Sequence, residues 1–63
     1  SAEARRVRGC LDTLEGKQRE AIVVAYYEGL TQEELAQRLA APLGTIKSWV
    51  RRGLLRLKEC LGP

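Results

Sequence analysis

The feature that most restricts the fold of this 63-residue chain is segment 43–61, whose apolar and basic residues separate onto two faces when the segment is drawn as a helix. At about 100° per residue, one set of mostly apolar residues falls within an arc of about 140°. The set is Ile46, Trp49, Val50, Gly53, Leu54, Leu57, Cys60 and Leu61. Polar and mostly basic residues occupy the remaining arc, and Leu55 is the apolar exception among them. The pattern predicts a helix that packs one face on a core and leaves a basic face outside.

Three shorter helices are expected before this segment, at about 2–12, 17–28 and 32–39, and no strand pattern competes with them. Gly29 is suited to a left-handed C-cap, and Thr31 with Glu34 forms a capping box that begins the third helix. Ala41-Pro42 then interrupts the helical pattern. The sequence therefore predicts an all-α, four-helix single domain over residues 1–63 that contains a helix-turn-helix. Because the first residue is Ser1 rather than Met, we expect the domain to be excised from a longer chain.

Positive charge is concentrated toward the C-terminus of the chain. Residues 1–40 hold six Lys/Arg and seven Asp/Glu, a balance of −1, and residues 41–63 hold five against one, a balance of +4, which together give the net charge of +3. A localised positive field of this kind attracts a polyanion such as nucleic acid. On charge alone, a solvated helix face remains the alternative.

Several classes of function lack the residues that they need. The chain has no His, and Cys10 and Cys60 stand fifty residues apart without a C-x-x-C pairing, so no metal site is expected. With no nucleophile motif and no Gly-rich phosphate loop, we expect neither an enzyme nor a cofactor nor a small-molecule substrate. No apolar run approaches the roughly 18 residues of a membrane span, so a cytoplasmic protein is expected. In that compartment the two cysteines are interpreted as small buried hydrophobic residues rather than as a redox pair.

The spacing of apolar residues in the second half of the chain fits a helix-turn-helix. Such a motif needs a small residue midway along its first helix, and Ala36 fills that position. Ten residues later, Ile46 would fix the second helix to the core, with Leu35, Leu39 and Val50 completing the apolar contacts. Paired short helices also occur in bundles that do not touch DNA. The residues on the outward face of the second helix therefore have to distinguish a DNA-binding motif from such a bundle.

The outward face of the last helix carries donors suited to DNA. Arg51 and Arg52 can each bond the O6 and N7 atoms of one guanine, and Lys47 can bond the same edge less rigidly. Ser48 is short enough for the helix to sink into the major groove, and Thr45, at the helix start, suits a phosphate oxygen. Arg56 lies further along and is expected to contact backbone phosphate.

The motifs themselves resemble a known family. The matching stretches are Leu14, 18–22, 26–36, 42–48 and 52–57, and the Gly-Thr-Ile-Lys-Ser run at 44–48 is specific in this context. Together they resemble the C-terminal promoter-binding region, region 4, of bacterial RNA polymerase sigma factors, most closely the extracytoplasmic-function group. The resemblance implies a domain that reads the minus-35 promoter element in double-stranded DNA, directs transcription initiation, docks on the β flap of RNA polymerase and is masked by an anti-sigma factor. It places Lys47, Ser48, Arg51 and Arg52 where family members touch DNA.

Two positions depart from the family pattern. Trp49 stands where an Arg usually follows the Lys-Ser pair, and we expect it to pack against the core. Ala40 stands where the turn usually has Gly, which implies a different turn or a mild strain.

Two other interpretations remain open from the sequence. LuxR-type response-regulator output domains share a similar pattern around residues 28–47, although they usually read Ser-His where this chain continues Ser48-Trp49. Alternatively, the domain could act mainly through protein contacts, with Leu55 and Tyr26 or Tyr27 exposed to a partner helix or flap.

Overall fold

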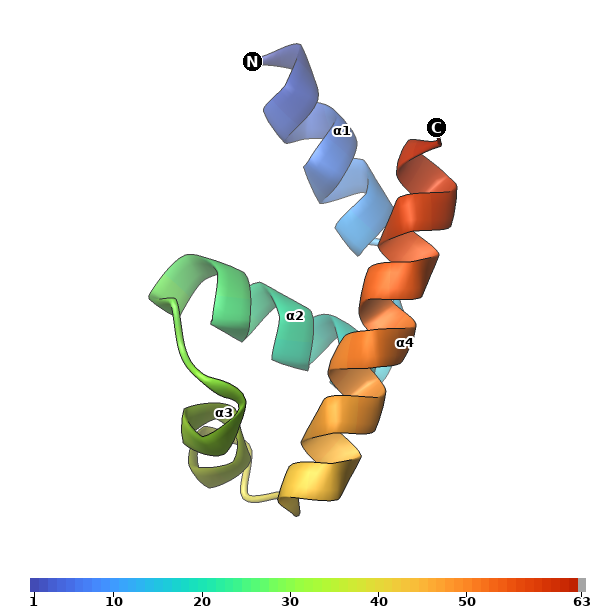
Figure 1. Ribbon diagram of the computed structural model, residues 1–63. Coiled ribbons are helices and arrows are strands. Elements are labelled where there is room, and N and C mark those ends of the chain that lie inside the picture. The colour runs from blue at the N-terminus through green and yellow to red at the C-terminus, as the bar shows by residue number, and fades with distance from the viewer. Residues whose placement is uncertain (63) are drawn as a thin grey trace.

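The structure, a computed structural model, describes residues 1–62, and these residues form four helices and no strand (Figure 1). The helices are α1 (Ala2–Leu11), α2 (Gly16–Glu28), α3 (Gln32–Arg38) and α4 (Leu43–Leu61). Each predicted boundary agrees to within one residue, and the expected all-α fold class is confirmed. Pro63, the last residue of the predicted domain, lies outside the described residues.

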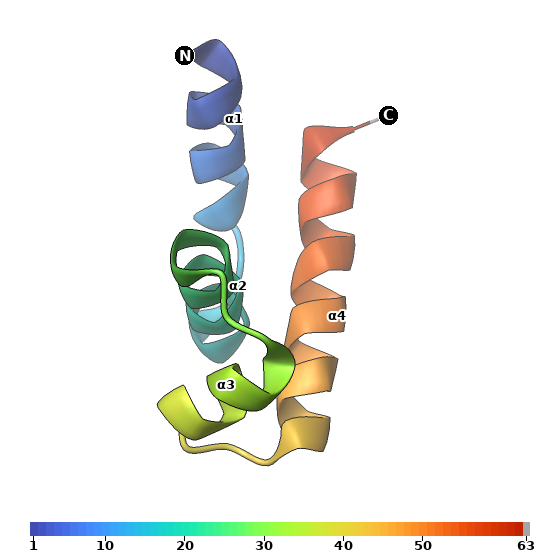
Figure 2. The same cartoon turned by 60° about the vertical axis from the view of Figure 1, so that its left-hand side comes forward.

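The four helices divide the molecule into two ends joined by α4. In Figures 1 and 2, α1 lies beside the last turns of α4 at the end that holds both termini, and α3 lies beside the first turns of α4 at the other end. α2 lies between these ends and packs on α4 and α3. The molecule measures 33 × 19 × 18 Å, so the 19-residue α4 runs along most of its length.

Local signals in the sequence begin and end these helices. The Ser1 hydroxyl accepts a hydrogen bond from the Ala4 amide at 3.2 Å, which caps α1. Gly29 ends α2 in the left-handed conformation, with φ 63°. The predicted capping box of α3 is present, because the Thr31 hydroxyl accepts from the Glu34 amide at 3.1 Å and the Glu34 carboxylate accepts from the Thr31 amide at 2.8 Å.

Two groups of buried residues hold the helices together. Leu11, Leu14 and Ile22 form a core cluster, against which pack Val7, Val23, Val50 and Leu57. Toward α3, Leu35 and Ile46 are fully enclosed. Between these groups α2 and α4 approach closely at Gly53, where a Cβ atom would lie 2.7 Å from Cγ1 of Ile22. A side chain at position 53 would therefore displace the Ile22 side chain or separate the two helices.

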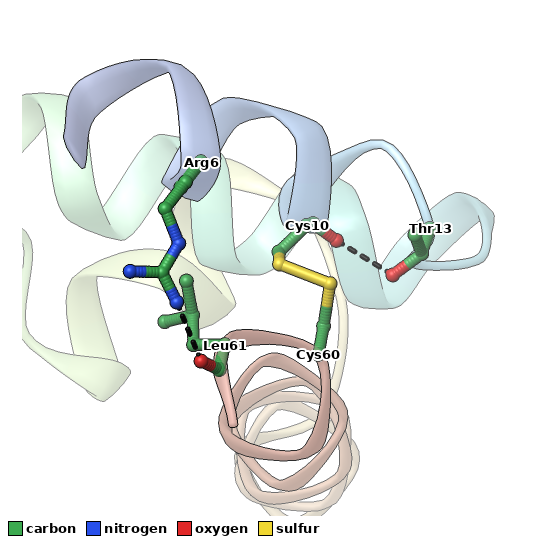
Figure 3. Close-up of a disulfide and its surroundings, with 5 residues drawn as sticks. All are labelled: Arg6, Cys10, Thr13, Cys60 and Leu61. Atoms are coloured by element: carbon green, nitrogen blue, oxygen red, sulfur yellow. Dashed lines mark hydrogen bonds between the residues drawn. A yellow bond between two sulfur atoms is a disulfide. The ribbon is translucent and has the colours of Figure 1, made fainter. Parts of the chain in front are cut away.

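The interpretation of the cysteines as unpaired hydrophobic residues is wrong. Cys10 and Cys60 form a disulfide between α1 and α4, with their Cα atoms 5.7 Å apart (Figure 3). Cys10 is buried, whereas Cys60 is exposed. The prediction failed because it was based on the expected compartment and on the spacing of the cysteines in the sequence. A separation of fifty residues does not reveal that the C-terminal turns of α1 and α4 lie side by side.

One more prediction needs correction within α4. Leu54 was expected in the apolar arc, but its side chain is 53% exposed. Leu54 marks the edge of that arc, and the neighbouring helices bury only the middle of it, at Ile46 and Gly53. Separately, no helix within residues 1–62 has both the length and the apolar character needed to cross a membrane.

Candidate nucleic-acid interface

The turn between α3 and α4 is closed by backbone hydrogen bonds. The Ala41 amide donates to the Ala36 carbonyl at 3.0 Å, and the Ala40 amide donates to the Gln37 carbonyl at 3.3 Å. This is the Schellman arrangement, whose first residue beyond the helix cap takes a positive φ and is usually glycine. Here that residue is Ala40, with φ 54°. Ala40 therefore adopts the conformation that glycine usually takes in this turn, and the Cβ atom of Ala40 causes the expected strain.

The turn fixes α4 across α3 through buried apolar contacts. Leu35 is 1% exposed and Ile46 is 0% exposed, so both predicted anchors of the helix-turn-helix are in the core. Ala36, Leu39 and Val50 are half-buried around them. This packing sets which face of α4 points outward.

Charged side chains strengthen the same end of the molecule. Arg38 donates to the Glu28 carboxylate at 2.6 Å, which joins the end of α2 to the end of α3. That hydrogen bond lowers the pKa of Glu28 and raises the pKa of Arg38. The hydrogen bond from the Thr31 amide lowers the pKa of Glu34. Both carboxylates are therefore charged at neutral pH, and both bonds are present.

The outward face of α4 brings together four of the six predicted DNA-binding residues. Lys47, Ser48, Arg51 and Arg52 are all exposed and line a single hollow on the surface. Within residues 1–62, none of the three cations forms a salt bridge or a side-chain hydrogen bond. Their donors are free to meet an anionic ligand.

The other two predicted residues lie outside this hollow. Thr45 is half-buried in the first turn of α4, where the N-cap Pro42 supplies no side-chain acceptor for the first amides. Arg56 is exposed one turn beyond Arg52. Trp49 is half-buried, as its position at the edge of the apolar arc predicted.

The structure adds one residue that the prediction of the site left out. Leu55 lines the hollow together with the four polar residues, and it is 54% exposed. The signal was present in the sequence, because about 100° per residue places position 55 in the middle of the basic arc. Leu55 was instead associated with a protein partner and was not included among the predicted DNA-binding residues.

A short α3, a tight turn and an α4 with an unpaired basic face together define a helix-turn-helix DNA-binding domain. Comparison with known families then gives the particular one. Residues 10–59 match the model of the Sigma-70, region 4 family, and the chain belongs to that family.

The relatives that the chain resembles are sigma factors. It is 58% identical over 60 residues to the ECF RNA polymerase sigma factor SigK of Mycolicibacterium vanbaalenii, which covers 95% of this chain and 31% of that protein. It is 55% identical over 60 residues to SigK of Mycobacterium sp. strain KMS, with the same 95% and 31% coverage. Against SigK of Mycobacterium tuberculosis strain H37Ra, identity is 52% over 59 residues, covering 94% of this chain and 32% of the relative. The chain thus spans about a third of the length of these relatives.

Proposed function

We propose that this chain reads the minus-35 element of promoter DNA as the C-terminal domain of an extracytoplasmic-function sigma factor, and so directs transcription initiation by bacterial RNA polymerase. The observation that carries the proposal is the exposed, unpaired basic hollow on α4. Membership of the region 4 family supports a promoter as the target and favours this function over that of a LuxR-type output domain. Residues 1–63 act as one binding domain in this proposal.

Each side chain of the hollow has a role in the proposed complex. Arg51 and Arg52 contact base edges in the major groove, because a guanidinium can donate two hydrogen bonds to one guanine. Lys47 donates from the preceding turn, and Ser48 leaves room for the helix to enter. These residues lie in the N-terminal half of α4, the part of a recognition helix that approaches the bases.

Thr45 and Arg56 hold the DNA backbone rather than the bases. Thr45 lies at the positive end of the α4 dipole, where amides without intrahelical partners donate hydrogen bonds to a phosphate oxygen. Arg56 lies beyond the hollow and reaches phosphate along the groove. Such contacts position the helix without specifying sequence.

Alanine substitution separates the two kinds of contact. Arg52→Ala is expected to cost about 1–3 kcal/mol on the preferred duplex and to relax preference at one base pair. Arg56→Ala is expected to weaken all duplexes alike and to reduce the slope of log affinity against log salt by about one. Arg5→Ala, which removes the same charge from α1, is the control and should leave sequence preference unchanged.

The measurement is fluorescence anisotropy of labelled duplexes at several salt concentrations. Low salt is needed because one small module makes few contacts, and the rest of a sigma factor would raise its effective concentration at the promoter. If Arg52→Ala and Arg56→Ala both bind like the unaltered chain, the recognition face is misplaced.

A second surface fits the protein partners that the resemblance implies. At the end with both termini, Val7, Leu11, Tyr26, Tyr27 and Leu61 line a hollow between α1, α2 and α4, with Arg6 and Arg8 also lining it. Tyr26 is 69% and Tyr27 is 65% exposed, and their rings meet edge to face with centroids 5.3 Å apart. Exposed aromatic side chains beside arginine are typical of protein interfaces.

This second surface is therefore the proposed contact for the polymerase β flap and for an anti-sigma factor. The double substitution Tyr26→Ala with Tyr27→Ala should abolish binding to RNA polymerase core while leaving duplex binding intact. Leu54→Ala, which removes an exposed apolar side chain elsewhere, is the control. In this proposal the domain works by binding alone, without catalysis, cofactor or membrane contact, in the cytoplasm where bacterial promoters are transcribed.

A further inference from the structure

Leu55 is the one apolar side chain in the basic hollow of α4, and its surroundings distinguish it from an ordinary exposed leucine. The other residues that line this hollow are Lys47, Ser48, Arg51 and Arg52. Its neighbour Leu54 is equally exposed, 53% against 54%, yet does not line the hollow. Exposure is therefore the same for the two leucines, and location is what separates them.

Helix geometry places the Leu55 side chain over the part of α4 that carries the arginines. Arg51 and Arg52 precede Leu55 by four and three residues, so all three share one face of the helix. Long side chains in a helix lean toward its N-terminus, so Leu55 covers the turn occupied by those arginines. Any base edge that Arg51 or Arg52 reaches is consequently next to an apolar surface.

We propose that Leu55 is a specificity-determining residue that contacts the C5-methyl group of a thymine in the major groove, next to the base pair read by Arg51 or Arg52. Thymine is the base that presents a methyl group in that groove, and apolar side chains recognise it by excluding water from both surfaces. The cationic surroundings favour a nucleic acid over a protein as the partner of this leucine. This inference rests on the proposed function of the face.

Removing the methyl group from the DNA tests the contact directly. The probe is the duplex that the unaltered chain enriches from a randomised pool, with each thymine replaced in turn by deoxyuracil. At one position the unaltered chain should lose about fourfold in affinity, the value of one buried methyl group. Leu55→Ala should bind the thymine duplex about four- to tenfold more weakly and should show no further loss with deoxyuracil at that position.

Leu54→Ala is the matched control, since it shortens a leucine of the same exposure on the same helix. It should keep the full fourfold response to deoxyuracil. Leu55→Lys gives a second, independent measurement: it should lose the thymine preference and steepen the salt dependence by about one phosphate contact. Melting temperatures of the three variants should match that of the unaltered chain, because both leucines are outside the core.

The possible outcomes separate this inference from the function on which it rests. If the pool yields no preferred sequence, or if Arg52→Ala binds like the unaltered chain, the proposed function fails. If Arg52→Ala loses specificity but no thymine position responds, or if Leu55→Ala responds to deoxyuracil as the unaltered chain does, the role of Leu55 is wrong. Loss of polymerase binding without loss of duplex binding in Leu55→Ala would likewise overturn it in favour of a protein contact.

Discussion

At the end of the molecule that holds both termini, α1 and the last turns of α4 are joined by the Cys10–Cys60 disulfide. Arg6 also donates to the Leu61 carbonyl there at 2.7 Å (Figure 3). At the opposite end, α3 and the first turns of α4 are held by the enclosed side chains of Leu35 and Ile46 and by hydrogen-bonded caps. The first end therefore adds a covalent bond to the packing of Leu11, Val7 and Leu57, whereas the second end depends on packing and caps.

This difference corresponds to the two proposed surfaces. The hollow that includes Tyr26 and Tyr27 opens at the cross-linked end, where large apolar side chains stay exposed. The basic hollow lies on α4 at the packed end, where the recognition helix needs a fixed orientation. A short chain with a small core can expose apolar surface for a partner when a cross-link supplies stability that burial does not.

Removing the cross-link is expected to have the largest effect on stability. A disulfide between residues fifty positions apart contributes about 4 kcal/mol by restricting the unfolded chain. Cys10→Ser with Cys60→Ser should lower the free energy of unfolding by that amount in urea denaturation, and reduction of the unaltered chain should give the same value.

Hydrogen exchange on the same variant tests whether the two ends are independent. Amides of α1 and of the last turns of α4 should lose more protection than those near Leu35 and Ile46, because only the first end loses its link. Equal loss at both ends would show a single cooperative unit and would remove the basis of the comparison.

Truncating an enclosed side chain at the packed end is expected to rank next. Leu35→Ala should cost about 3 kcal/mol, through lost burial and the cavity left behind. Thermal unfolding measures the loss, and Leu54→Ala, at an exposed leucine, should change stability by less than about 0.5 kcal/mol.

Duplex binding should weaken in Leu35→Ala under conditions in which α1 stays linked to α4. If Leu35→Ala is destabilised but binds DNA normally, packing at Leu35 does not orient the recognition helix.

The packed end could be predicted from the sequence in detail, because local chemistry determines it. Gly29, the Thr31–Glu34 box and the Ala41-Pro42 break each act within one turn of backbone, and each appears in the structure where it was predicted. The outward exposure of Lys47 and Arg52 followed from helical spacing alone.

The cross-linked end could not be predicted in the same way, since it depends on contacts between distant segments. Pairing of Cys10 with Cys60 requires the C-terminal turns of α1 and α4 to meet, and no local pattern encodes that approach. The exposure of Leu54 has the same origin, because the width of the buried stripe depends on how far the neighbouring helices extend over α4. Of the candidate site, helical spacing predicted both the cationic face and the position of Leu55 on it, whereas the single hollow that they line follows from the three-dimensional structure.

Relieving the strained turn is expected to have a smaller effect, and one of opposite sign. Ala40→Gly should stabilise the domain by about 1 kcal/mol, because glycine takes the observed φ of 54° without a Cβ penalty. The greater conformational entropy of glycine in the unfolded chain offsets part of this stabilisation. Gly29→Ala, at φ 63° in the C-cap of α2, is the reciprocal control and should destabilise. If Ala40→Gly lowers the melting temperature, the turn is not strained.

Mild acid is expected to have the smallest effect and to act on the packed end. Glu28 and Glu34 both have folded-state pKa values below the ordinary 4.5, Glu28 through the hydrogen bond from Arg38 and Glu34 through that from the Thr31 amide. A carboxyl group whose pKa is lowered on folding binds fewer protons in the folded state. Its stabilising contribution is therefore complete above about pH 4.5 and is lost as the pH falls through the folded-state value. Both carboxylates are exposed, so solvent keeps each contribution small.

Neutral isosteres separate these two groups from the other carboxylates of the chain. Glu34→Gln keeps an acceptor for the Thr31 amide, since glutamine also serves at this position of a capping box, but it does not titrate. Between pH 6 and pH 3.5, the protection factors of α3 amides, which correct for the pH dependence of intrinsic exchange, should fall in the unaltered chain. They should fall less in Glu34→Gln, and less again when Glu28→Gln is added. Exchange in α1, where the disulfide does not titrate, should be less affected throughout. Equal acid sensitivity of α1 and α3 would mean that protonation destabilises the whole domain. The capping box and the Arg38–Glu28 pair would then not stabilise the end of the domain that carries the recognition helix.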